Sequence, residues 1–91
     1  MIELYLRNDC KFCDKVTAVV KELNLRDGID FRVINSDQGT QGRKITKEIG
    51  GKEQFPFMVL RENEQILNKD VAWMYESSDI MDFLKSWHIP K

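Results

Sequence analysis

The chain of 91 residues is 42% hydrophobic and 32% charged, and its formal net charge is −1. This length predicts one domain over residues 1–91, and the near balance of acids and bases excludes the basic stripe of a nucleic-acid-binding protein. No apolar run approaches the roughly 18 residues of a membrane span, and the first residues are too charged for a signal peptide, so we expect a cytoplasmic protein with no membrane or nucleic-acid partner.

The first half of the chain predicts a strand, a helix and a second strand. Residues 2–6 are β-prone and alternate apolar with other side chains, which is typical of a strand. Asn8 and Asp9 then supply helix-start side chains just before Cys10. The following apolar positions have the spacing of one helical face: Val16, Val19, Val20 and Leu23. A short second strand is expected over 31–34.

The second half predicts a helix over about 41–49, with Ile45 and Ile49 facing inward and Gly50-Gly51 ending it. A strong strand follows over 57–60 and a weaker one over 65–67, while 68–75 has no assignment. The last helix is capped by Ser77 or Ser78, and its apolar face is formed by Ile80, Phe83, Leu84 and Trp87. The order β-α-β-α-β-β-α predicts an α/β fold with a four-stranded mixed sheet flanked by three helices.

Cys10 and Cys13, the only cysteines, define the candidate active site. Cys10 falls at a strand-to-helix junction, where free backbone N–H groups and the helix dipole favour an anion and should depress the pKa of its thiol. Arg7 and Lys11 add positive charge nearby, and Asp9 opposes them unless its carboxylate caps the helix. We therefore expect an exposed nucleophile at Cys10 and a shielded resolving thiol at Cys13.

Other interpretations of the cysteine pair are weaker. Two buried, inert cysteines are one alternative. Structural zinc needs four ligands, and no second Cys or His pair exists, so no metal site is expected. His88 is the sole histidine, and nothing places it beside Cys10 for a Cys-His hydrolase.

Two further segments carry candidate binding groups. Pro56 directly precedes a strand, either as a simple strand-initiating residue or in a cis Phe55–Pro56 bond that would present the backbone of Phe55 to a ligand. The start of the last helix can bind a ligand carboxylate through its free N–H groups. Trp73 could pack over the site, although we expect it in the core.

Taken together, these segments resemble the glutaredoxin family, which has the thioredoxin-like fold. The matching pieces are a Cys-x-x-Cys after the first strand, an X-Pro before the third and Ser-Ser-Asp at the last helix. The Tyr-Glu-Ser-Ser-Asp-Ile segment is also similar to the N-terminal domain of glutathione transferases.

The resemblance implies a glutathione site. Arg7 would meet a glutathione carboxylate or stabilise the thiolate, Lys11 stands where the family has Pro, and Phe12 stands where it often has Tyr. The backbone of Phe55, beside Pro56, would pair with the cysteinyl part of glutathione. The γ-glutamyl end would be held by Ser77, Ser78 and Asp79.

The sequence thus predicts a monomeric, glutathione-dependent thiol–disulfide oxidoreductase that reduces protein disulfides or glutathione mixed disulfides. Three alternatives remain open: a redoxin reduced by thioredoxin reductase, a pair of chains sharing a [2Fe–2S] cluster through Cys10 and two glutathiones, and an interaction domain without turnover. A complete glutathione transferase is not expected, because the chain lacks its second helical domain.

Overall fold

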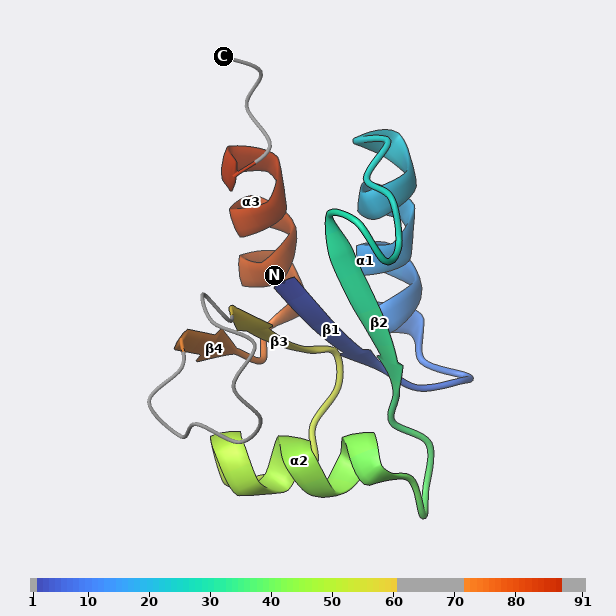
Figure 1. Ribbon diagram of the computed structural model, residues 1–91, viewed down its shortest axis with the longest axis vertical. Coiled ribbons are helices and arrows are strands. Elements are labelled where there is room, and N and C mark those ends of the chain that lie inside the picture. The colour runs from blue at the N-terminus through green and yellow to red at the C-terminus, as the bar shows by residue number, and fades with distance from the viewer. Residues whose placement is uncertain (1, 61–71, 88–91) are drawn as a thin grey trace.

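The computed structural model describes residues 2–60 and 72–87, which form a single α/β arrangement (Figure 1). The element order confirms the predicted β-α-β-α-β-β-α order. The elements are β1 (Ile2–Leu6), α1 (Lys11–Glu22), β2 (Phe31–Asn35), α2 (Gln41–Gly50), β3 (Phe57–Leu60), β4 (Ala72–Met74) and α3 (Ser77–Trp87).

The four strands form one mixed sheet in the order β2-β1-β3-β4. β1 pairs in parallel with β2 and antiparallel with β3, and β3 pairs antiparallel with β4. α1 connects the parallel strands β1 and β2, and α2 connects β2 to β3, which pairs antiparallel with β1. This is the thioredoxin-like topology, as predicted.

The fourth strand corrects the sequence analysis. The structure places β4 at Ala72–Met74, within the segment left unassigned, and the predicted strand over 65–67 lies outside the described residues. The position of β4 is fixed by pairing, with Trp73 opposite Val59. Because a three-residue edge strand owes its place to that cross-strand contact, its own sequence carries little signal.

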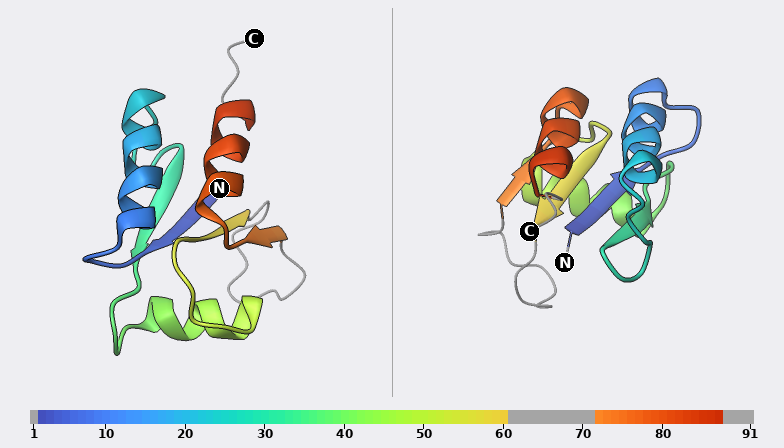
Figure 2. Two further views of the ribbon diagram at one scale, coloured as in Figure 1. Left: turned by 180° about the vertical axis from the view of Figure 1, so that it is seen from behind. Right: turned by 90° about the horizontal axis from the view of Figure 1, so that it is seen from above.

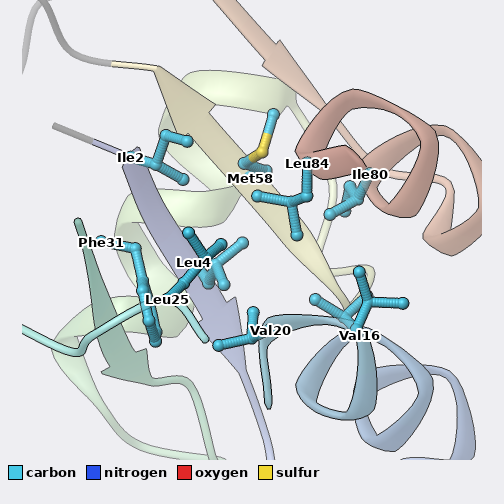
Figure 3. Packing of buried hydrophobic residues seen from close by; sticks show 10 residues of the cluster. Ile2, Leu4, Val16, Val20, Leu25, Phe31, Met58, Ile80 and Leu84 are labelled. Atoms are coloured by element: carbon cyan, nitrogen blue, oxygen red, sulfur yellow. The ribbon is translucent and has the colours of Figure 1, made fainter. Parts of the chain in front are cut away.

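The three helices divide between the two faces of the sheet. α1 and α3 lie side by side on one face, and α2 crosses the other (Figures 1 and 2). Between the sheet and the α1/α3 pair lies an apolar cluster without polar side chains (Figure 3): Ile2, Leu4, Val16, Val19, Val20, Leu25, Phe31, Met58, Ile80 and Leu84. None of the helices in the described part of the chain is long and apolar enough to cross a membrane.

A second cluster lies toward α2, and we call it the aromatic cluster: Tyr5, Cys10, Cys13, Ile49, Phe55, Phe57, Val59 and Tyr75. Ile45 packs against it, so the predicted inward face of α2 is confirmed. Because both faces of the sheet are covered, β1 is buried along most of its length, and its odd and even side chains enter different clusters.

Helix termini set the positions of the site residues. α2 begins after Thr40, whose hydroxyl accepts the backbone N–H of Arg43, and ends at Gly51 with φ 90°, a left-handed conformation that favours glycine. α3 begins at Ser77, and the carbonyl of Glu76 accepts the N–H of Ile80. The predicted cap at Ser77 or Ser78 is therefore wrong, because the capping position falls on Glu76.

Candidate active site

The two cysteines form a disulfide at the start of α1, with their Cα atoms 5.1 Å apart. Cys10 is the N-cap residue, and its Sγ accepts a hydrogen bond of 3.1 Å from the backbone N–H of Cys13. The sulfur, not the predicted Asn8 or Asp9, therefore caps the helix. This N–H, which has no intrahelical partner, and the positive end of the helix dipole meet at the sulfur, and both favour a thiolate when the pair is reduced.

The expected exposure of Cys10 is wrong for this disulfide state, because only 3% of its surface is accessible. Its Sγ lies 4.0 Å from the carbonyl oxygen of Phe55, within the aromatic cluster. Cys13 is buried as predicted, at 2% exposure.

The charged residues before and after Cys10 point elsewhere. The guanidinium of Arg7 donates to the carbonyl oxygens of Asn8 and Asp9 at 3.2 and 3.3 Å. Asp9 is exposed and has a φ of 53°, and Lys11 is exposed on the first turn of α1. Arg7 and Lys11 therefore lie near the cysteine pair without touching its sulfurs.

The Phe55–Pro56 bond is cis, which selects the second of the two alternatives for Pro56. Within residues 2–60 and 72–87, the backbone N–H of Phe55 has no hydrogen-bond partner, so it remains available to a ligand. The ring of Phe55 is buried in the aromatic cluster, and the Arg43 guanidinium lies 5.0 Å from its centroid. The ring of Phe55 therefore packs in the cluster, while its backbone N–H has no partner among the described residues.

A cleft of about 290 Å³ runs beside this amide. Four of the predicted site residues line it, namely Phe12, Phe55, Pro56 and Ser77. Three lining residues were missed by the sequence analysis: Gln54, Tyr75 and Glu76. Each of these residues directly precedes a predicted site residue or another lining residue, and this position in the sequence is the signal that could have identified it.

The residues that line the cleft differ in character. Phe12 is 56% exposed and forms an apolar wall on which Lys15 stacks, with Nζ 5.2 Å from the ring centroid. Ser77, the first residue of α3, also lines the cleft, while Ser78 and Asp79 are exposed on the first turn of this helix outside the lining. The first N–H groups of a helix have no intrahelical partner, so this end can accept an anion.

Tyr75 forms a rigid part of the cleft wall. Its hydroxyl donates to the carbonyl of Lys52 at 2.7 Å and accepts the N–H of Lys52 at 3.2 Å. Burial raises the pKa of Tyr75 above its usual 10.0, against a smaller opposite effect of the hydrogen bond to Lys52. Gly50 makes room for the ring, because a Cβ there would overlap the Tyr75 side chain.

Trp73 is not in the core, which corrects the expectation. It is 41% exposed on the edge strand β4, and its ring packs against Phe57 and Tyr75 with centroids 6.0 and 5.4 Å apart. It therefore supports the cleft wall from behind without lining the cleft. No group of three or more potential metal ligands occurs among the residues that the structure describes.

The chain matches a family of known proteins over most of its length. Residues 4–89 match the family model described as "Glutathione S-transferase, N-terminal domain". The chain belongs to this family. This match confirms the sequence resemblance to the N-terminal domain of glutathione transferases. It does not specifically support the resemblance to glutaredoxins. No curated protein matches the chain.

Solved structures of glutathione transferases have the same fold. Omega 2C and Omega 2S of Trametes versicolor, the latter in complex with 2,4-dihydroxybenzophenone, superpose with TM-scores of 0.79 and 0.74 at 13% and 10% identity. The Leishmania trimeric glutathione transferase TDR1 superposes with a TM-score of 0.68 at 22% identity. Each match covers 96% of this chain, but this chain spans only 38%, 37% and 18% of theirs.

Proposed function

We propose that this domain is a glutathione-dependent thiol–disulfide oxidoreductase, with Cys10 as the nucleophile and Cys13 as the resolving thiol. The observation that carries the proposal is the position of the pair. Cys10 caps α1 through the N–H of Cys13, near the amide of Phe55, which has no partner among the described residues, and near a cleft lined by Ser77 at the start of α3. The family adds glutathione as the thiol ligand.

The chemistry is two thiol–disulfide exchanges. The Cys10 thiolate attacks one sulfur of a substrate disulfide, forms a mixed disulfide and releases the other sulfur as a thiolate that takes up a proton. Cys13 loses its proton and attacks Cys10, which yields the disulfide form and the second substrate thiol. Two glutathione thiols then restore the dithiol and leave as glutathione disulfide.

The residues around the cleft fit the groups of glutathione. The N–H of Phe55 would bind the cysteinyl amide beside Pro56. The γ-glutamyl carboxylate would lie at the N–H groups of Ser77 and Ser78, with the ammonium near a carboxylate of Glu76 or Asp79. Phe12 would cover the thiol, and Arg7 and Lys11 would attract the glycine carboxylate.

A glutathione-coupled reduction assay tests this proposal with two variants. Cys10→Ser should abolish reduction of both a glutathione mixed disulfide and a protein disulfide. Cys13→Ser should keep the first activity, because glutathione itself resolves a glutathione mixed disulfide on Cys10. It should lose the second, because the Cys13 thiol that releases a protein substrate from its mixed disulfide is missing. Full activity of Cys10→Ser would contradict the proposal.

Replacing glutathione with thioredoxin reductase in the same assay distinguishes the two electron donors. Brown colour after anaerobic reconstitution would favour the shared [2Fe–2S] cluster instead. Retention of a cellular phenotype by Cys10→Ser would favour an interaction domain.

Glutathione conjugation is a second candidate, and the family match favours it. A conjugating enzyme activates the glutathione thiol toward an electrophile and has no need of a resolving cysteine. Conjugation of an aryl chloride that is unaffected by Cys13→Ser, without any disulfide reduction, would select this candidate.

A further inference from the structure

The loop that carries Cys10 is tied to the chain segment between β2 and α2. The backbone N–H of Asn8 donates to Oδ1 of Asp37 at 2.8 Å, and Asn8 Nδ2 donates to Oδ2 of the same carboxylate at 2.7 Å. Both oxygens of Asp37 thus hold one residue that lies 29 positions away in sequence. We call this pair of bonds the Asn8–Asp37 clamp.

Asp37 is itself held in place. Its backbone N–H donates to the Asn35 side chain at 2.9 Å, and its carbonyl accepts both the N–H and the hydroxyl of Thr40, at 3.1 and 2.6 Å. Thr40 in turn caps α2. The N–H of Ser36 donates to the carbonyl of Leu6 at 2.8 Å, which joins the two segments at the base of the loop. The carboxylate is therefore a fixed acceptor.

The other side of the loop is held by Arg7. Its guanidinium bridges the carbonyls of Asn8 and Asp9, and Asp9 adopts a φ of 53°. A non-glycine residue in this left-handed region needs support from its surroundings. The clamp and the Arg7 bridge supply that support one residue before the sulfur.

We propose that Asp37 is a positioning residue for the nucleophile. By fixing the loop, the clamp sets Cys10 Sγ at 3.1 Å from the N–H of Cys13, where a thiolate gains a charge-assisted hydrogen bond. Asp37 itself touches neither cysteine and acts through Asn8. This inference rests on the proposed role of Cys10 as the reacting thiol.

Alkylation of Cys10 by iodoacetamide tests the clamp, with the rate measured against pH in a Cys13→Ser background. Asp37→Asn removes the carboxylate charge from both bonds and keeps the second bond only if the Asn8 amide turns over, so the clamp is weakened in either orientation. The pH midpoint should rise and the rate at neutral pH should fall about threefold, a fraction of the roughly tenfold effect of losing a hydrogen bond to a charged group altogether.

The direction in which the pH midpoint moves distinguishes the positioning of Cys10 from a direct effect of the Asp37 charge. Removing a negative charge near Cys10 would by itself favour the thiolate, lower the midpoint and raise the rate. The exchanged pair Asn8→Asp with Asp37→Asn restores both donor–acceptor contacts at the same net charge, so it should return the midpoint toward that of the parent. Asn8→Ala, which keeps only the backbone bond, should shift the midpoint in the same direction as Asp37→Asn.

Asp27→Asn is the matched control. Its Oδ1 accepts the N–H of Val33 at 3.3 Å. Asp27 precedes β2 whereas Asp37 follows it, so the pH midpoint of Cys10 in Asp27→Asn should equal that of the parent. An unchanged or lowered midpoint in Asp37→Asn, or no recovery in the exchanged pair, would overturn the proposal. The assay needs neither glutathione nor a disulfide substrate, so an inactive domain with a raised midpoint would refute only the proposed function.

Discussion

The two faces of β1 serve different ends. Ile2 and Leu4 enter the apolar cluster under α1 and α3, which has no polar side chain. On the other face, Glu3 is buried and accepts the hydroxyl of Tyr5, which belongs to the aromatic cluster with both cysteines. One strand therefore supports stability on one side and carries the candidate chemistry on the other.

This division predicts that substitutions in the two clusters have separable effects. Leu84 is fully buried in the apolar cluster, so Leu84→Ala should lower the free energy of unfolding by about 2–5 kcal/mol. The alkylation rate of Cys10 in the folded protein should stay unchanged. Urea unfolding with a parallel alkylation assay checks both, and a large change in the alkylation rate would break the division.

Gly50→Ala tests the face of the sheet that carries the aromatic cluster. Its new methyl group would overlap the Tyr75 side chain, so the ring must shift at a cost of about 1–3 kcal/mol. Because Tyr75 lines the cleft, glutathione affinity should also fall, as calorimetry would measure. Lys44→Ala, an exposed position on the same helix, serves as the control, and equal affinities in the two variants would contradict the account.

The local parts of this architecture could be predicted from sequence, and the parts that depend on pairing could not. The cysteine pair and the helix periodicities are encoded within a few residues, but the choice between a cis and a trans Phe55–Pro56 bond depends on the surrounding fold. By contrast, β4 is fixed by its contact with β3, and the burial of Cys10 follows from packing against Phe55, which is distant in sequence. Glu76 reaches the cleft only because α3 begins directly after it.

Tyr75→Phe removes the hydroxyl bonded to Lys52 and should cost about 1 kcal/mol. Burial raises the pKa of Tyr75 in the folded state, so the folded protein loses stability relative to the unfolded chain as pH rises from the ordinary value of 10.0 through the folded-state pKa, whereas Tyr75→Phe has no group that titrates there. The stability difference between wild type and Tyr75→Phe should therefore shrink above pH 10.0. A difference that stays constant or grows there would refute the assigned cause.

Phe12→Ala should have the smallest effect on stability. The side chain is 56% exposed, so the free energy of unfolding should change by no more than about 0.5 kcal/mol. Glutathione affinity should nevertheless fall, because Phe12 walls the cleft. Ile29→Ala, at 60% exposure and outside the lining, is the matched control, and equal affinities would remove Phe12 from the proposed site.

The most direct test of Cys10 as the nucleophile is a trapping experiment. Reduced Cys13→Ser protein is mixed with glutathione disulfide, and intact mass is followed over time, with Cys10→Ser as the comparison. The account predicts a single glutathione adduct on Cys10 of the first variant and none on Cys13 of the second. An unmodified Cys10, or a Cys13 that reacts equally fast, would contradict it.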